Sequence, residues 1–192
     1  MAISIRSGTV LGGRYLMIDL LSEAHGGKFW RAHDRILSRS VAVHVIPADD
    51  ERSDLLTAAA RQSALVNDSG ALRVLDIDVR EGWCYVVNEW GRGTSLDRHL
   101  AYGPIEAHRA AWIVGSVAQT VAQAHDQGVA HGRLVPENVL LDHNGEVKLI
   151  GLAVDAALHG LPPARFDTDF TDLAALLYAG LTGKWAGVSR SA

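Results

Sequence analysis

The chain has 192 residues, a net charge of −4 and 48% apolar residues, with no block of basic side chains. This length and apolar fraction allow one ordinary domain or two small lobes around one cleft. Nucleic acid is excluded as the main partner, because neutralising phosphates requires clustered Lys and Arg. The single cysteine, Cys84, excludes an internal disulfide and indicates a reducing compartment. No apolar run reaches membrane-spanning length and no signal peptide begins the chain, so any membrane anchor belongs to a longer parent.

The first half of the chain is predicted to contain short strands and one helix. Its apolar runs are rich in β-branched and aromatic residues, which favours strands. One segment instead carries a thin apolar face at helical spacing, with Asp54 as a candidate cap. The expected elements are a flexible lead over 1–12, strands over 14–21, 28–33 and 41–46, a helix over 50–66, and strands over 72–79 and 83–89.

The second half is predicted to be mainly helical. Its longest helix has Pro104 in the first turn and Gly128 at the C-terminal cap, positions that suit these residues. An Asp-His-Asn-Gly turn at 142–145 predicts a hairpin. The expected elements are a short helix over 95–101, a long helix over 104–127, strands over 139–141 and 146–150, and an apolar helix over 169–181.

Residues 131–141 read H-G-R-L-V-P-E-N-V-L-L, between the long helix and a short strand. This stretch resembles the catalytic loop of protein kinases, H-R-D-L-x-x-x-N. His131 matches the family's His and Asn138 its Asn, but Arg133 stands at the position of the catalytic Asp. A guanidinium stays protonated at physiological pH, so Arg133 provides no general base.

The resemblance implies an α+β, two-lobed protein kinase-like fold. Its five-stranded N-lobe with one main helix would cover residues 13–91. Residues 92–192 would form a partial, helical C-lobe that is truncated after its central helix. The resemblance covers roughly residues 13–183, which is the first two-thirds of the family's domain.

The other motifs of the family keep their spacing but lose their charged residues. The glycine-rich loop retains only Gly27 at a glycine position, and Phe29 replaces the Val that covers the adenine. By this resemblance, four residues replace the family's Lys, Glu, catalytic Asp and metal-binding Asp: His44, Ala59, Arg133 and Gly151. We therefore expect a pseudokinase that is not an enzyme, with no cofactor and no metal.

The apolar residues around the nucleotide position are largely retained. Glu89 and Trp90 match the hinge, with Asn88 at the gatekeeper position. The resemblance also implies that Asp169 caps the backbone of the catalytic loop. A vestigial pocket with no bound nucleotide is expected from Phe29, Ala42, Asn88, Trp90, Asn138 and Leu140.

Within bacterial Ser/Thr kinases, the sequence is similar to the kinase-like cytoplasmic domain of mycobacterial MviN proteins. These are membrane proteins of the lipid-linked peptidoglycan precursor pathway. The resemblance implies a regulatory protein-interaction module tethered to the inner face of the plasma membrane. It also implies phosphorylation on Thr by an active bacterial Ser/Thr kinase and binding by a forkhead-associated (FHA) domain protein that reads phosphothreonine. Nucleic acid is not an expected partner, and membrane contact arises only through a longer parent chain.

Alternatives remain for the function and for single residues. The chain is alternatively a nucleotide sensor without phosphoryl transfer, or an atypical kinase with a displaced acid, Asp155 or Glu137. Arg133 either binds a phosphate or carboxylate or forms a surface salt bridge. The nine histidines lack the paired spacing of zinc sites, so we expect no metal among them. The five tryptophans are core residues or, where exposed, mark an interface.

Overall fold

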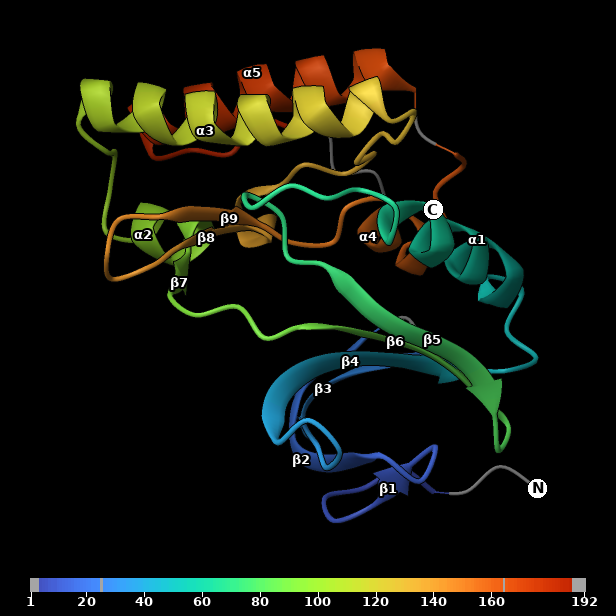
Figure 1. Cartoon of the computed structure of the whole chain (residues 1–192). Coiled ribbons are helices and arrows are strands. Elements are labelled where there is room, and N and C mark those ends of the chain that lie inside the picture. Colours follow the sequence, from blue (N-terminus) through green and yellow to red (C-terminus); the bar gives the residue numbers. More distant parts are fainter. Residues whose placement is uncertain (1–3, 25, 164, 188–192) are drawn as a thin grey trace. The chain divides into compact units, whose positions relative to one another are not determined.

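The computed structural model describes residues 4–24, 26–163 and 165–187. The chain divides into two compact units. The first contains the residues up to Ala64 together with Arg73–Trp90, and the second contains Leu65–Leu72 and the residues from Gly91 onward. Figure 1 shows the helices and strands of both units.

The first unit is an antiparallel sheet with one helix. The six strands follow the order β1-β2-β3-β4-β6-β5. Successive apolar side chains of β4 alternate in direction, so Val41, Val43 and Val45 enter one core while Ala42 and His44 face the other side. The elements are β1 (Val10–Leu11), β2 (Tyr15–Ala24), β3 (Gly27–Asp34), β4 (Arg39–Pro47), α1 (Ser53–Ser63), β5 (Val74–Arg80) and β6 (Trp83–Glu89).

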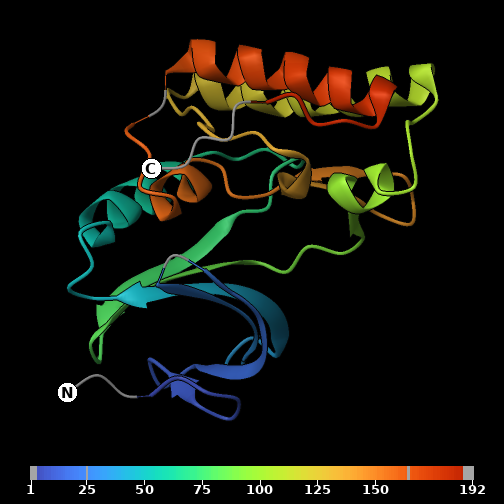
Figure 2. The ribbon, with the colours of Figure 1, turned by 180° about the vertical axis from the view of Figure 1, so that it is seen from behind.

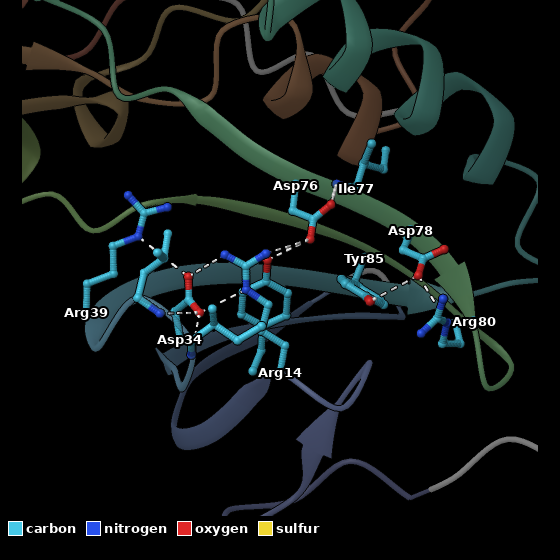
Figure 3. A network of polar contacts seen from close by, with 11 residues as sticks. Arg14, Asp34, Arg39, Asp76, Ile77, Asp78, Arg80 and Tyr85 are labelled. Carbon is cyan, nitrogen blue, oxygen red and sulfur yellow. Dashed lines mark hydrogen bonds and ion pairs between the residues drawn. The ribbon is translucent and has the colours of Figure 1, made fainter.

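A polar network connects β2 to β5, two strands that are not neighbours in the sheet (Figure 3). The Tyr15 hydroxyl donates to Asp76 at 2.6 Å. Arg14, just before β2, donates to both carboxylate oxygens of Asp34 at 2.9 and 2.7 Å and lies 3.9 Å from Asp76. Asp34 is fully buried and also accepts two backbone N–H groups of the following turn. The network therefore holds the curled sheet closed around its core.

The second unit is mainly helical. Helices α3 and α5 lie side by side in both ribbon views (Figures 1 and 2). Their facing apolar side chains pack with β8 and β9 in one core, which includes Ile113, Val117 and Leu176. The elements are β7 (Thr94–Ser95), α2 (Leu96–Leu100), α3 (Ala107–Asp126), the 3₁₀ turn η1 (Pro136–Asn138), β8 (Val139–Leu141), β9 (Val147–Leu149), α4 (Val154–Leu158) and α5 (Phe166–Thr182).

The predicted order of elements is confirmed, with differences at several boundaries. Residues 1–3 of the expected flexible lead lie outside the described residues, but Val10–Leu11 pairs with β2 and Leu11 is fully buried. The buried side chain of Leu11 fixes this segment in the core. The sequence does not predict the strand, because two residues are too few to show a strand's periodicity. Helix α1 begins at Ser53, so Asp54 lies in its first turn and is not its cap.

The boundary between the two units also differs from the prediction. Leu65–Leu72, which was expected in the first lobe, belongs to the second unit. Its backbone explains this placement, because the N–H of Leu72 donates to the carbonyl of Leu149 at 2.8 Å. Asp68 accepts a hydrogen bond from Thr120 on α3 at 3.0 Å. In the part of the chain that the structure describes, no helix is long and apolar enough to cross a bilayer.

Candidate functional site

The loop after α3 is held by two carboxylates of α5. The buried Asp169 accepts the backbone N–H groups of His131 and Gly132, both at 2.8 Å. One turn further along α5, Asp172 accepts the N–H of Leu134 at 3.1 Å. Backbone groups buried without partners are costly, so these carboxylates fix the path of the loop. The capping role expected of Asp169 is confirmed.

His131 is a structural anchor of the loop. Its side chain is fully buried, and Nε2 lies 2.9 Å from the carbonyl oxygen of Ile150. A carbonyl only accepts, so Nε2 carries the hydrogen and Nδ1 is left as an acceptor. Nδ1 accepts the N–H of Arg133 at 3.4 Å. His131 thus ties the loop to the end of β9.

The side chain of Arg133 points to Asp155, at the start of α4. Its Nη1 donates to Oδ2 of Asp155 at 2.6 Å. Asn138 Nδ2 donates to the same oxygen at 2.9 Å and to the carbonyl of Arg133 at 3.0 Å. Burial, the largest single influence, would raise the pKa of Asp155, but the charges of Arg133 and His159 and the hydrogen bonds from Asn138 and Arg133 together outweigh it, so the pKa is lowered. Asp155 is therefore an ionised, hydrogen-bonded carboxylate at neutral pH. Arg133 therefore pairs with a carboxylate of its own chain, and the pair is largely buried, unlike the surface salt bridge that was one of its two expected roles.

Gly151 makes room for this carboxylate. Its φ is +78°, a conformation that suits glycine. A Cβ added at this position would lie 2.7 Å from Cβ of Asp155, closer than side-chain carbons approach. A side chain at residue 151 and the observed position of Asp155 therefore exclude each other.

The predicted site residues that belong to strands of the first unit lie on one face of its sheet. His44 is the cross-strand partner of Phe29, and Ala42 is the partner of Asn88. The Phe29 ring stacks on the His44 imidazole, with ring centroids 4.3 Å apart and planes at 14°. Ala59 is buried within α1. This stack fills the space above His44 with an aromatic ring.

The six residues of the expected pocket are divided between the two units. Phe29, Ala42, Asn88 and Trp90 belong to the first unit, whereas Asn138 and Leu140 belong to the second. Within the second unit, Asn138 is buried and faces Arg133 and Asp155. Glu89, at the expected hinge, forms a 2.6 Å ion pair with Arg73, the residue before β5.

Two site residues were missed by sequence reasoning. Asp172 follows Asp169 by three residues, a spacing that places both carboxylates on one helix face. His125, in the last turn of α3, lies 2.8 Å from Oδ2 of Asp169 and stacks on Phe166. The spacing between His125 and His131 matches no motif, so the sequence gives no signal for His125. Among the described residues, no group of three or more His, Cys, Asp or Glu is placed to hold a metal ion.

Two curated relatives and one crystal structure show what the chain resembles. It is 32% identical over 169 residues to the serine/threonine-protein kinase PknA of Mycobacterium tuberculosis, covering 81% of this chain and 39% of PknA. It is 24% identical over 156 residues to the serine/threonine-protein kinase PrkC of Bacillus subtilis, covering 79% of this chain and 24% of PrkC. The PknI kinase domain of Mycobacterium tuberculosis matches with a TM-score of 0.79 at 19% identity, covering 98% of this chain and 81% of that one. The chain thus spans less than half the length of these curated relatives.

The comparisons contradict the prediction that the chain is not an enzyme. The relatives that it matches are named as serine/threonine-protein kinases. The prediction rests on the family's motif positions, where Arg133 and Gly151 replace the two carboxylates. The structure places Asp155, which the sequence analysis gives as one of two candidate displaced acids, beside Asn138.

The family and the fold class are shown by agreement of sequence and structure. The protein kinase domain family matches residues 20–162, which is most of the chain. The PknI structure confirms the two-lobed α+β fold. Homologues of the chain therefore belong to bacterial Ser/Thr signalling. The chain is a member of the protein kinase domain family.

Proposed function

We propose that the chain is a regulatory protein-interaction module of bacterial Ser/Thr phosphosignalling. In this proposal an active bacterial Ser/Thr kinase phosphorylates it on threonine, and an FHA-domain protein then binds it. The module would be tethered to the inner face of the plasma membrane and act in peptidoglycan synthesis, as in the MviN proteins that it resembles. Binding of such partners is compatible with phosphoryl transfer by the same domain.

The observation that carries this proposal is a row of exposed apolar side chains on the second unit. Phe170 is 61% exposed and Tyr178 48% exposed, at positions that share one face of α5. Trp112 on the neighbouring α3 is 53% exposed. Contiguous exposed apolar side chains are typical of protein-binding surfaces. We define the apolar face as Trp112, Phe166, Phe170, Tyr178, Leu181 and Trp185.

Threonines next to this face support the phosphorylation step. Among the described residues, Thr171 and Thr182 are the threonines that are exposed, and both lie on α5. Their hydroxyls donate to backbone carbonyls of the preceding turn, at 3.3 Å for Thr171 and 2.8 Å for Thr182. A phosphate in either place would add about two negative charges that an Arg-bearing domain reads.

Mass spectrometry after incubation with an active bacterial Ser/Thr kinase tests the first step. The proposal predicts one or more phosphothreonines, which alanine at the mapped position removes. The variant Tyr178→Ala tests the apolar face: it should weaken partner binding and leave phosphorylation unchanged. Absence of any phosphothreonine on the folded chain would refute the phosphorylation step.

A second candidate function is nucleotide binding, which the pairing of Asp155 with Asn138 favours. Carboxylate and amide oxygens, such as those of Asp155 and Asn138, are ligands of the kind that hold a nucleotide's Mg²⁺. A nucleotide at about 100 times its dissociation constant would stabilise the fold by about 2.7 kcal/mol. Thermal unfolding with ATP and Mg²⁺ or Mn²⁺ would show this as a rise of several degrees. No shift in the wild type or in Phe29→Val, which removes the ring above His44, would reject the candidate.

A further inference from the structure

The hairpin that joins β3 to β4 ends in exposed apolar side chains. Ile36 is 71% exposed and Leu37 is 55% exposed, so neither side chain contributes to the core of the first unit. Arg35 and Arg39 flank the pair in sequence, and the Arg39 side chain is 37% exposed. We define residues 35–39 as the hairpin tip. It combines two apolar side chains with two cations on the surface of the molecule.

Asp34 fixes the backbone of the hairpin tip. Its buried carboxylate accepts the N–H groups of Ile36 and Leu37 at 3.1 and 3.2 Å. The N–H of Arg35 donates to the carbonyl of Arg14 at 3.1 Å. Three successive backbone donors of the tip therefore have acceptors within the protein. Unpaired N–H groups make it costly to move a turn out of water, so this turn can enter an apolar medium at a lower cost.

The charge around the hairpin tip is positive. Arg14 and Arg39 lie on two sides of Asp34, at 2.7 and 3.6 Å (Figure 3). Asp76 is the second carboxylate of this group and lies 3.9 Å from Arg14. Among the described residues, no carboxylate forms an ion pair with Arg35. Three guanidinium groups thus face two carboxylates, which leaves one positive charge in excess.

The local charge matters more than the net charge of −4 of the whole chain. At physiological ionic strength, exposed charges are screened beyond about 8 Å. A surface that touches the hairpin tip therefore interacts mainly with its arginines.

The small size of the hairpin tip decides which partner fits. Specific protein interfaces bury roughly 800 Å² on each partner, far more than two side chains at the end of a hairpin provide. Nucleic acid would use the arginines and leave Ile36 and Leu37 without a role. A bilayer uses both, because apolar side chains enter among the headgroups while guanidinium groups stay beside the lipid phosphates.

We propose that the hairpin tip inserts Ile36 and Leu37 into the headgroup region of an anionic lipid bilayer. Arg35 and Arg39 then contact the lipid phosphates. This contact belongs to the first unit and does not require an anchor elsewhere in the chain. It depends on neither phosphorylation nor a protein partner, so its failure would leave the proposed function standing.

Sedimentation with lipid vesicles tests the proposal on the whole chain. One set of vesicles contains phosphatidylglycerol and phosphatidylcholine in equal parts, and the other contains phosphatidylcholine alone. Because each arginine gains attraction from an anionic surface, we expect about fivefold or more stronger partitioning onto the anionic vesicles. The double variant Ile36→Ser/Leu37→Ser should lower this partitioning by about tenfold or more, and Arg35→Gln should lower it by about fivefold.

A matched control comes from β2 of the same unit. Leu20 and Leu21 are 44% and 45% exposed, so they also form an exposed apolar pair. They lie between Asp19 and Glu23, whose carboxylates are 50% and 57% exposed and would be repelled by anionic lipid. The double variant Leu20→Ser/Leu21→Ser should therefore bind the anionic vesicles as the wild type does. Circular dichroism checks that each variant is folded.

Three results would overturn the proposal. The first is a wild-type chain that does not bind anionic vesicles. The second is an equal loss of binding in the control variant, or no loss in Ile36→Ser/Leu37→Ser and Arg35→Gln. The third concerns a second copy of the chain as the partner: if light scattering shows self-association without lipid, and Ile36→Ser/Leu37→Ser abolishes it, the hairpin tip is an interface between copies.

Discussion

Replacing Asp169 by alanine should destabilise the second unit strongly. The carboxylate accepts the N–H groups of His131 and Gly132 and contacts His125, all at 2.8 Å. Alanine would leave at least two buried N–H groups without acceptors, each costing about 1–3 kcal/mol. Together these losses lower the free energy of unfolding by about 4 kcal/mol. For a chain of this size, that loss lowers the midpoint of thermal unfolding by about 8–16 °C.

Thermal unfolding followed by circular dichroism measures this loss, and hydrogen exchange locates it. The matched control is Asp167→Ala, because Asp167 lies two residues away on the same helix with an exposed side chain. We expect it to cost less than about 1 kcal/mol. In Asp169→Ala, the amides of residues 131 and 132 should also exchange faster than in the control. If both variants unfold at the same temperature, the loop does not depend on Asp169 and the reasoning fails.

Three further predictions concern the polar network and the apolar face. The hydrogen bonds from Arg14 and two backbone N–H groups outweigh burial and hold the pKa of Asp34 well below its usual value. Because the pKa of Asp34 is lower in the folded state than its value of about 3.9 in the unfolded state, the ionised carboxylate stabilises the fold above that pH. The urea midpoint of the wild type should therefore fall as the pH drops below about 4, and it should fall by less in Asp34→Asn. Tyr15→Phe should cost about 1–1.5 kcal/mol in urea unfolding, because it removes the 2.6 Å bond to Asp76; no change would mean that this bond contributes nothing to closing the sheet. Tyr178→Ala should change stability by less than about 1 kcal/mol but weaken partner binding by about tenfold, as isothermal titration would show; unchanged affinity would place the partner elsewhere.

The fold was predictable from the sequence where local signals agree. The strand expected over 83–89 forms β6 (Trp83–Glu89), and the long helix expected over 104–127 forms α3 (Ala107–Asp126). In α3, an apolar stripe and a C-terminal glycine point to the same element. Helix α4 was missed because five residues are too few to show a period.

The site was predictable only in its backbone anchors. His131 and Asp169 occupy the positions that the resemblance implies, and their hydrogen bonds hold the backbone of the loop. The contact between Asp155 and Asn138 joins residues 17 positions apart and depends on the turn at Gly151. A motif compares fixed positions along the chain. A carboxylate that lies at another position in the sequence but reaches the same place in the structure therefore does not match the motif. From the sequence alone, Asp155 is only one of two candidate displaced acids.

The measurement that tests the proposed function most directly is a calorimetric titration of an FHA-domain protein into the chain. One sample is phosphorylated by an active bacterial Ser/Thr kinase, and a second is the same material after phosphatase treatment. The proposal predicts saturable binding to the phosphorylated chain and none after phosphatase treatment, since the added charge is what an FHA domain reads. Equal binding to both samples, or binding to neither, would contradict it.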